Sequence, residues 1–441
     1  MSGIICLEVC MVSTIEICGG KRLGGETAVQ GSKNAVLPVL AATLLNQSES
    51  IIHNCPDLAD VRTSFRIIEE LGGRVYYSGH TAIVNTENVN VTKIPDSLMS
   101  SARSSVLFLG AMLSRLRYAE VTRPGGCAIG LRPIDLHIKA FRELGAEIDE
   151  TGGKLYCSLE NFKPGIIDLP FPSVGATENI MLISAVSRGE TVITNAACEP
   201  EIICLQEFLN EMGADIRGAG SEKIYISGVE KLRKVEYTII SDRIFAATCA
   251  AAAACCGGDV LLKNTEPSHM RLMLSMLRDA GCRVSCNDDS VRIRACDRLR
   301  GLGKIITAPY PGFPTDMQPQ IAVVLGISEG TSTVTESIFE NRFKYVGELA
   351  RMGANFKVES NIAIIGGIEN YTGARVNAPD LRAGAALVIA GLAAEGITVV
   401  DDIYYIERGY EEFEKKLASL GAVIEKVSTE KEIQKFTLKV S

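Results

Sequence analysis

The chain lacks the features of a membrane protein, a nucleic-acid-binding protein or a metalloprotein. Its longest apolar stretch, near Ile244–Cys256, is rich in Ala and about 13 residues long, too short to span a bilayer. The net charge of −8 provides no overall positive field to attract DNA or RNA. Four His residues are scattered along the chain, and no two of them stand at metal-ligand spacing. We therefore expect a protein that uses no metal and binds neither membranes nor nucleic acid.

Cysteine is abundant, with 14 residues, but its pattern does not predict disulfides or a zinc site. Disulfide frameworks belong to short secreted chains, and the N-terminus lacks the basic start and long apolar core of a signal peptide. The CxxxC pairs Cys6/Cys10 and Cys282/Cys286 lack the CxxC spacing and the His companions of a zinc site. Others, such as Cys249, sit in apolar helical runs as small core residues do. We expect a cytoplasmic protein in a reducing compartment.

One five-residue pattern returns six times along the chain. An apolar residue is followed by Gly, and another apolar residue stands three positions after the Gly. The steps between copies are 68 to 73 residues, and the copies begin at Leu71, Leu144, Met212, Ala280, Met352 and Leu420. A period of this length indicates one supersecondary unit repeated six times.

The third copy illustrates the unit that we expect. Apolar residues at helical spacing predict two helices, and β-branched runs predict the strands. Gly213 follows the second helix, where a left-handed cap belongs. The predicted order is helix, strand, helix, strand, strand, at Gly175–Arg188, Thr191–Asn195, Pro200–Met212, Ala214–Arg217 and Lys223–Ser227.

The repeats predict an α/β (α+β) protein of two domains. Three units can share one helical core in a domain of roughly 200 residues, which is a normal size. Residues 13–30 are out of phase with the repeats and are expected to complete a sheet with the last copy. The expected domains are residues 31–240, and residues 1–30 together with 241–441.

The first helices of several units begin with cations. Helix N-termini carry unpaired N–H groups and partial positive charge, so Lys or Arg in the first turn is unfavourable. Four of the six units nevertheless have one there, namely Lys33, Arg103, Arg243 and Arg382. A solvated surface charge explains any single case equally well. The recurrence favours a shared anion site, in a cleft formed where two sets of helix ends face each other.

The loop before the second helix of the second unit is longer than its counterparts. It is rich in Gly and places Cys127 between Arg123 and Arg132. Gly residues let a backbone approach a ligand closely, and neighbouring Arg side chains lower the pKa of a thiol. The loop therefore predicts a reactive Cys127; the alternative is an inert loop thiol.

Seven motifs, spread over nearly all of residues 13–441, together resemble the enolpyruvyl transferase family. They are specific in sequence, and one of them contains the Cys loop. The motifs are Gly31–Ala35 (GSKNA), Pro124–His137 (PGGCAIGLRPIDLH), Ser173–Thr177 (SVGAT), Gly312–Gln318 (GFPTDMQ), Glu340–Phe343 (ENRF), Asp380–Ala383 (DLRA) and Arg408–Tyr410 (RGY).

The resemblance implies a fold and a reaction. The fold is a two-domain inside-out α/β barrel built from six βαβαββ-type repeats, three per domain. The reaction transfers the enolpyruvyl group of phosphoenolpyruvate to the 3-hydroxyl of UDP-N-acetylglucosamine, with release of phosphate, as the first committed step of peptidoglycan synthesis. The family uses no metal and no redox cofactor.

The resemblance also assigns the residues of the reaction. Lys33, Arg132 and Arg408 match the positions that grip phosphoenolpyruvate, and planar Arg side chains suit carboxylate and phosphate groups. Asp316 matches the base at the sugar hydroxyl, and Cys127 the thiol that acts as proton donor. Further matching positions around the substrates are Asn34, Arg103, Glu340 and Arg382.

The nucleotide sugar is assigned to two other segments. The matching residues are Arg132, Pro133, Ile134, Asp135, Leu136 and His137, then Ser173, Val174 and Gly175, and finally Ile338, where the family often has Val. Gly175 opens a predicted helix, which suits a phosphate at a helix N-terminus. Some family members carry Lys where this chain has Phe171, so diphosphate binding here is expected to rely on Arg132 and backbone N–H groups.

Two other functions remain open on the sequence alone. The sister reaction of the family uses shikimate 3-phosphate as the acceptor, and the GSKNA motif and the Cys loop argue against it. A non-catalytic paralogue that binds a UDP-sugar would retain the fold, but Lys33, Cys127, Asp316 and Arg408 are all present.

Overall fold

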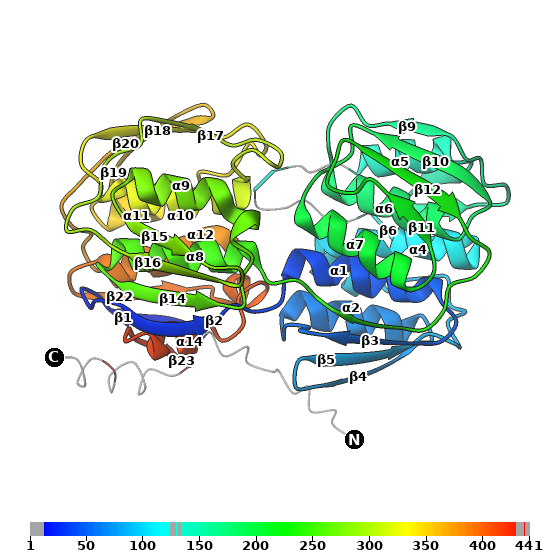
Figure 1. Ribbon diagram of the computed structural model, residues 1–441, viewed down its shortest axis with the longest axis horizontal. Helices are drawn as coiled ribbons and strands as arrows, with labels where there is room; N and C mark the ends of the chain where they lie inside the picture. Colours follow the sequence, from blue (N-terminus) through cyan, green and yellow to red (C-terminus); the bar gives the residue numbers. More distant parts are fainter. Residues whose placement is uncertain (1–12, 124–128, 131–133, 429–435, 437–441) are drawn as a thin grey trace, which may run out of the picture.

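The computed structural model describes residues 13–123, 129–130, 134–428 and 436, which form two lobes side by side (Figure 1). The first lobe, on the right of the figure, contains the elements from α1 to β13. The second lobe, on the left, contains β1, β2 and the elements from α8 to β23. None of the described helices has the length and apolarity that crossing a bilayer requires.

The helices follow the predicted repeat. Helices of the first lobe are α1 (Lys33–Ala42), α2 (Ala59–Glu70), α3 (Asp96–Ser101), α4 (Leu107–Leu116), α5 (Asp135–Glu143), α6 (Val174–Ala185) and α7 (Pro200–Glu211). Those of the second are α8 (Arg243–Cys255), α9 (Arg271–Asp279), α10 (Gln318–Gly326), α11 (Val346–Arg351), α12 (Leu381–Ala393), α13 (Tyr404–Glu407) and α14 (Phe413–Ser419). Four 3₁₀ turns are described: η1 (Thr43–Leu45), η2 (Arg103–Val106), η3 (Pro267–Met270) and η4 (Thr315–Met317).

The strands are short, as the β-branched runs predicted. In the first lobe they are β3 (Glu49–His53), β4 (Arg74–Ser78), β5 (Thr81–Asn85), β6 (Tyr118–Thr122), β7 (Glu147–Thr151), β8 (Lys154–Ser158), β9 (Ile166–Asp168), β10 (Gly189–Thr194), β11 (Asp215–Arg217), β12 (Lys223–Gly228) and β13 (Val235–Thr238). In the second lobe they are β1 (Thr14–Cys18), β2 (Gly24–Ala28), β14 (Asp259–Lys263), β15 (Arg283–Cys286), β16 (Ser290–Arg294), β17 (Lys304–Ile306), β18 (Thr331–Thr335), β19 (Asn355–Glu359), β20 (Ile362–Gly366), β21 (Arg375–Asn377), β22 (Ile397–Asp401) and β23 (Val423–Val427).

The predicted unit is confirmed in the third copy, where α6, β10, α7, β11 and β12 follow in order. In the second copy Arg103 was expected in the first turn of the first helix, but α4 begins at Leu107. Ser101 ends the short α3, and the η2 turn separates the two helices. Arg103 therefore lies in a 3₁₀ turn before α4 and not in the first turn of an α-helix.

Five of the six described sheets contain a parallel strand from elsewhere in the same lobe, and the sheet of β6, β7 and β8 has only the parallel bridge between Lys93 and Glu120. The last strand of one unit pairs with the next unit, as β9 does with β10 and β17 with β18. In the first lobe β13 returns to pair with β3, which closes the ring of three units. Because these sheets take a strand from another part of the chain, their units cannot complete them alone.

The N-terminal strands enter two different sheets, which corrects the expectation for residues 13–30. β1 lies between β22 and β23 of the last unit, as predicted. β2 pairs instead with β14 of the fourth unit. β2 therefore closes the ring of three units in the second lobe, as β13 does in the first lobe.

The first helices of the units form the interior, and the sheets lie outside them. α8 is buried along almost its whole length, and α10 and α12 pack against it and each other. A helix that is apolar on all sides belongs in a core. The second helices are amphipathic, as α9 is with Met273, Leu274 and Leu277 buried. This is the inside-out arrangement that the resemblance implied.

The buried apolar residues form two clusters, one for each lobe. One cluster runs from Ala35 to Ile239, and the other combines Ile15–Val29 with residues 244–424. The chain crosses between the lobes twice, at Gln30–Ser32 and Ile240–Asp242. Ser32 N–H donates to Ile240 O (2.8 Å), and Asp242 N–H donates to Gln30 O (2.9 Å). The two crossing segments are thus hydrogen-bonded to each other at the lobe junction.

Candidate active site

Three buried helix starts meet at the lobe junction, and their caps explain why cations are tolerated there. Ser32 Oγ accepts from Ala35 N–H (3.3 Å) at the start of α1. Asp242 caps α8, and Asp380 caps α12, by accepting two backbone N–H groups each. The two carboxylates supply negative charge where the helix dipole favours it. The adjacent Lys and Arg side chains are therefore free to serve other partners.

Lys33 and Arg408 share one buried carboxylate, that of Asp60. Lys33 Nζ lies 2.8 Å from Asp60 Oδ2. Arg408 donates from Nε to Oδ1 (2.9 Å) and from Nη2 to Oδ2 (3.2 Å). Lys33 and Asp60 come from α1 and α2 of the first lobe, whereas Arg408 follows α13 of the second. Asp60 thus draws a cation from each lobe to one point.

The electrostatics of these groups are coupled. Burial, the largest influence, lowers the pKa of Lys33; Asp60 opposes this, while Arg382 and Arg408 lower the pKa further. Burial would raise the pKa of Asp60, but Lys33 and Arg408 outweigh it and hold the pKa below its usual value. Lys33 and Arg408 thus share the carboxylate of Asp60, and Arg382 adds a third positive charge that acts on Lys33, which is an environment suited to a small polyanion.

Asp316, the predicted base, lies between two buried guanidinium groups. Its Oδ1 accepts from Arg342 Nη2 (2.9 Å), and its Oδ2 accepts from Arg382 Nη2 (3.2 Å). Both Arg side chains are almost fully buried, whereas 29% of the Asp316 side chain is exposed. The two bonds fix the orientation of the carboxylate, and its exposed part can receive a proton from a ligand.

The ends of the Cys loop reach the second lobe. Asn341 N–H donates to Ile129 O (3.0 Å). A Cβ at Gly130 would lie 2.3 Å from Glu340 Oε2, and the φ of this Gly is +153°. Only Gly permits this close approach between the loop and Glu340. Cys127, Arg132 and Pro133 lie outside the described residues.

Some of the residues predicted to bind the nucleotide lie around the start of α6. Ser173 caps this helix by accepting from Ala176 N–H (3.4 Å), and Val174 and Gly175 form its first turn. A Cβ at Gly175 would lie 3.1 Å from His137 Cε1. His137 is buried on α5, so the helix start and the imidazole share one site.

The residues next to these in the sequence do not all point to the same place. Ile134 is buried and Leu136 packs against the core of the first lobe. Asp135 is exposed and pairs with Arg123 (3.1 Å). Phe171 is exposed, and its carbonyl accepts from Ser173 N–H (2.7 Å) just before α6.

Two further predicted residues lie at the edges of the junction. Asn34 is half-buried in the first turn of α1, beside Lys33. Ile338 is half-buried in the loop after β18, where its N–H donates to Glu336 Oε1 (2.9 Å). Glu336 also accepts from the hydroxyls of Thr307 and Thr315 (2.9 Å each), which steadies the loop that carries Ile338 and Glu340.

Several residues of the site were not predicted from the sequence. Asp60 and Arg342 are the clearest, since each binds a predicted residue. Asp60 stands in the first turn of an amphipathic helix, where an acidic residue is ordinary, so its position carried no signal. Arg342 belongs to the ENRF motif, and that motif was the available signal.

A second charged cluster connects the lobes nearby. Arg243 Nε donates to Glu201 Oε1 (3.0 Å), and both side chains are buried. Burial, with smaller contributions from Glu201 and others, raises the pKa of Glu199 to about 7. Burial and the same two carboxylates raise the pKa of Glu178 well above its usual value. Arg243 also lies over the ring of Tyr310 (5.5 Å). These carboxyl groups outnumber the guanidinium, so protonation compensates part of the excess charge.

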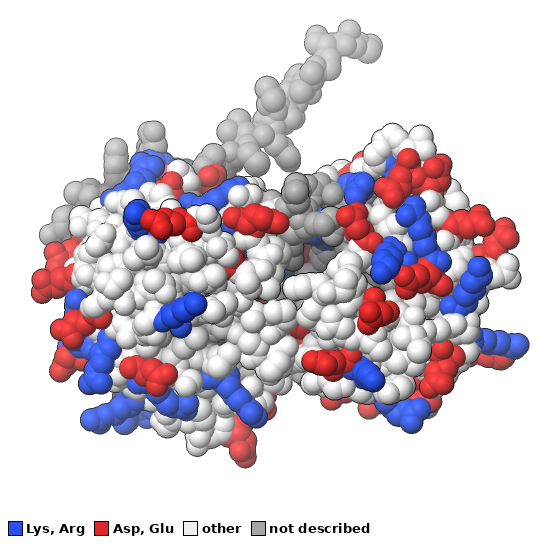
Figure 2. Space-filling view, turned by 90° about the horizontal axis from the view of Figure 1, so that it is seen from above, with Lys and Arg blue, Asp and Glu red and all other residues white. Residues whose placement is uncertain are grey.

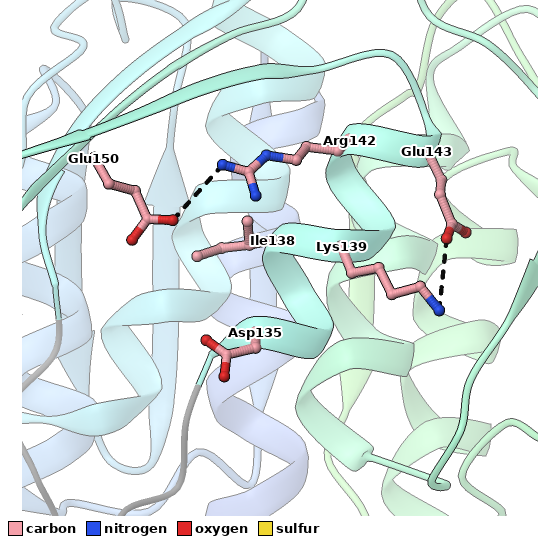
Figure 3. Close-up of a pocket in the computed structure, with 6 residues that line it drawn as sticks. All are labelled: Asp135, Ile138, Lys139, Arg142, Glu143 and Glu150. Carbon is pink, nitrogen blue, oxygen red and sulfur yellow. Dashed lines mark ion pairs between the residues drawn. The ribbon is translucent and has the colours of Figure 1, made fainter.

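A surface pocket away from the junction has a different character. A pocket of about 340 Å³ lies along α5 and is lined by Asp135, Ile138, Lys139, Arg142, Glu143 and Glu150 (Figure 3). Its charged side chains pair with each other, as Arg142 does with Glu150 and Lys139 with Glu143 (3.7 Å each). Figure 2 shows positive and negative side chains interspersed over both lobes.

Comparison with known proteins identifies what this arrangement is similar to. Residues 17–417 match the family described as EPSP synthase (3-phosphoshikimate 1-carboxyvinyltransferase). The chain is 51% identical over 412 residues to UDP-N-acetylglucosamine 1-carboxyvinyltransferase 2 of Caldanaerobacter subterraneus subsp. tengcongensis, covering 93% of this chain and 99% of the relative. It is 46% identical to UDP-N-acetylglucosamine 1-carboxyvinyltransferase of Finegoldia magna, covering 95% of this chain and all of the relative.

Solved structures agree with these sequences. The enolpyruvyl transferase NikO from Streptomyces tendae superposes with a TM-score of 0.85 at 26% identity, over 95% of this chain and 99% of that one. An EPSP synthase from Acinetobacter baumannii has a TM-score of 0.73 at 20% identity, over 94% and 100%, a likeness that concerns the fold alone. The fold class predicted from the six repeats is confirmed.

Proposed function

The chain belongs to the enolpyruvyl transferase family, and we propose that it transfers the enolpyruvyl group of phosphoenolpyruvate to the 3-hydroxyl of UDP-N-acetylglucosamine. The observation that carries the proposal is the identity of 45–51% to several relatives that bear the name of this activity. The reaction releases phosphate and begins peptidoglycan synthesis, and we place this first step in the cytoplasm.

Lys33 and Arg408 bind phosphoenolpyruvate in this proposal, together with Arg132. Their meeting at Asp60 supports the assignment, because it brings a cation from each lobe to one place. Arg382 adds a third positive charge close enough to lower the pKa of Lys33. Bidentate Arg groups suit the carboxylate and phosphate of the substrate, and Lys adds a point charge.

The chemistry is an addition followed by an elimination. Protonation of the terminal carbon of phosphoenolpyruvate makes the central carbon electrophilic, and the thiol of Cys127 donates its proton to the departing phosphate. The sugar oxygen attacks that carbon while Asp316 takes the hydroxyl proton, which gives a tetrahedral ketal. Loss of a proton from the new methyl group and departure of phosphate restore the double bond. The two Arg partners of Asp316 support its role because they hold the carboxylate in one orientation.

The nucleotide part binds at the start of α6 and beside His137. The N-terminus of a helix offers N–H groups and positive potential to a phosphate. Ser173, Val174 and Gly175 provide that helix start, and His137 lies against it. Glu340, Ile338 and Asn34 approach the substrates from the junction.

The two domains close on these substrates. We assign residues 31–240 to one domain, and residues 1–30 with 241–441 to the other. The division of the buried apolar residues into two clusters supports these limits. The contact of Ile129 with Asn341 supports closure, because it joins the Cys loop of one domain to the ENRF motif of the other.

Incubation with phosphoenolpyruvate and each acceptor, followed by mass spectrometry of the products, tests the proposal. We expect enolpyruvyl-UDP-N-acetylglucosamine and an equal amount of phosphate. A product formed only with shikimate 3-phosphate would establish the sister reaction instead. Binding of the UDP-sugar without any phosphate release would indicate a non-catalytic paralogue.

A further inference from the structure

Asn179 of α6 is a fully buried amide that contacts three groups in the first lobe. Its Oδ1 lies 2.9 Å from Gly110 N, and its Nδ2 lies 3.2 Å from Val106 O. Its Nδ2 also lies 2.8 Å from Nδ1 of His137. A buried amide with partners on every side is held in one position.

The two backbone partners determine which way the amide points. A backbone N–H can only donate, so the atom facing Gly110 N is the amide oxygen. A backbone carbonyl can only accept, so the atom facing Val106 O is the amide nitrogen. Both contacts require the same orientation. The amide nitrogen is therefore the atom that faces His137.

This orientation determines the protonation of His137. Because Asn179 Nδ2 donates, Nδ1 of His137 must accept and carries no hydrogen. The proton of the neutral imidazole then stands on Nε2. Burial, with a smaller contribution from Arg103, lowers the pKa of His137 to about 4, so the ring is also neutral at physiological pH.

The protonated nitrogen lies at the start of α6. A Cβ on Gly175 would be 3.4 Å from His137 Nε2, which places this nitrogen against the first turn of the helix. The first N–H groups of a helix lack intrahelical acceptors and point the same way. Arg103, whose charge acts on His137, adds a cation. Nε2–H of His137 and the first N–H groups of α6 are donors, so this place suits a ligand that presents acceptor oxygens.

We propose that Asn179 is a positioning residue that fixes His137 in the Nε2–H tautomer, so that a neutral imidazole donates to an acceptor oxygen of the nucleotide. The identity of that ligand rests on the proposed function; the tautomer does not. A neutral donor adds a directed hydrogen bond without placing a second buried charge beside Arg103.

Nitrogen-15 NMR of the histidine side chains tests the tautomer on the unaltered protein. The chain has four His, so His137→Gln identifies the signals of His137. We expect a protonated Nε2, an unprotonated Nδ1, and no titration between pH 5.5 and 8. A protonated Nδ1, or titration near pH 6.5, would overturn the role of Asn179.

Addition of UDP alone tests the contact to the nucleotide. We expect the Nε2 resonance to shift on binding, with Nδ1 still unprotonated. UDP binding that leaves Nε2 unchanged would refute the contact. Absence of UDP binding would instead count against the proposed function, since the tautomer is read without any ligand.

The variant Asn179→Asp tests the consequence for catalysis. A carboxylate at this position accepts a hydrogen from Nδ1, so the neutral imidazole carries its proton on Nδ1 and Nε2 can no longer donate to the nucleotide. We expect the KM for UDP-N-acetylglucosamine to rise about tenfold, the change for one lost hydrogen bond, with the KM for phosphoenolpyruvate within twofold. Asn210→Asp is the matched control, because the side chain of Asn210 bonds to both backbone groups of Ile216 in the same lobe. Equal effects of the two variants on both KM values would contradict the proposal. If Asn179→Asp fails to fold, the NMR measurement on the unaltered protein still decides.

Discussion

At the scale of single residues, Asp60 explains how two buried cations from different lobes coexist. Lys33 and Arg408 would repel each other without a counter-ion, and Asp60 contacts both. The removal of one member of a buried ion pair leaves uncompensated charge, which costs more than an exposed pair contributes. Asp60 is thus a positioning residue for the anion site.

The variant Asp60→Asn should lose both stability and Lys33 protonation. We expect the free energy of unfolding to fall by about 3 kcal/mol, as for other broken buried pairs. Because Asp60 raises the pKa of Lys33, its loss lowers that pKa further, and turnover should decline at a lower pH on the alkaline side. Denaturant unfolding and a pH–rate profile measure these effects.

Asp57→Asn is the control for Asp60. Asp57 pairs with Arg62 at 2.6 Å near the same helix, but on the surface. We expect this variant to change the unfolding free energy by less than about 1 kcal/mol and to leave the pH profile unaltered. Equal losses of unfolding free energy in the two variants would mean that the buried ion pairs of Asp60 do not account for its effect.

Asp316 differs from Asp60 because its carboxylate is partly exposed. In Asp316→Asn we expect kcat to fall by about 10² to 10⁴, the usual contribution of general acid–base catalysis, with substrate binding retained. Single-turnover kinetics and calorimetry separate the two quantities. Asp259→Asn is the matched control, since Asp259 also binds two Arg side chains, on the surface of the same lobe. A catalytic rate unchanged in Asp316→Asn would remove this residue from the chemistry.

At the scale of elements, the starts of four buried helices carry residues of the candidate site. The same capping pattern places Lys33, Arg243 and Arg382 at the lobe junction, each in the first turn of a buried helix. The start of α6 differs, since it has no acidic residue and no cation in its first turn. Its backbone N–H groups and the close approach of Gly175 to His137 are what it offers to a ligand.

The variant Gly175→Ala tests the start of α6. A Cβ there would lie 3.1 Å from His137 Cε1, so the imidazole must shift by a few tenths of an ångström. We expect a several-fold higher KM for UDP-N-acetylglucosamine and an unchanged KM for phosphoenolpyruvate, measured by steady-state kinetics. Gly347→Ala in α11 is the control, because no atom lies within 4 Å of its Cβ position. If both KM values rise together, the helix start does not serve the nucleotide alone.

At the scale of the whole molecule, the lobes are joined by charged contacts as well as by the two chain segments that cross between them. Glu199 and Glu201 of the first lobe face Arg243 of the second. Since the pKa of Glu199 is raised to about 7, the folded protein binds more protons than the unfolded chain between pH 4.5 and 7. Stability therefore falls as pH rises through this range.

Glu199→Gln should flatten that pH dependence. A pKa difference of this size corresponds to at most about 3 kcal/mol between pH 4.5 and 7. We expect the variant to lose less stability than the parent over this interval, as measured by urea unfolding at pH 5 and pH 7.5. Glu190→Gln, at an exposed position of β10, should follow the parent. Identical slopes in parent and Glu199→Gln would show that Glu199 does not bind the extra proton.

Much of the fold and of the site could be predicted from local sequence. The periodicity predicted the helices and strands of the third unit, and Lys33, Arg382 and Arg408 were expected to act together. Asp60 was missed because an acid at a helix start is common, and β2 was assigned to the wrong sheet because strand pairing is not local. The start of α4 was misplaced because two other helical segments, α3 and η2, directly precede it in the chain.

The sequence by itself determined the six repeats, the class of fold and the family, because spacing and motif are properties of the chain alone. Only the tertiary structure decided which charges share a partner and which nitrogen of His137 carries the proton. Those facts depend on contacts between residues far apart in the sequence, such as Asp60 with Arg408 and Asn179 with His137. Hydrogen bonds and ion pairs act over a few ångströms, and only folding brings these groups within that range.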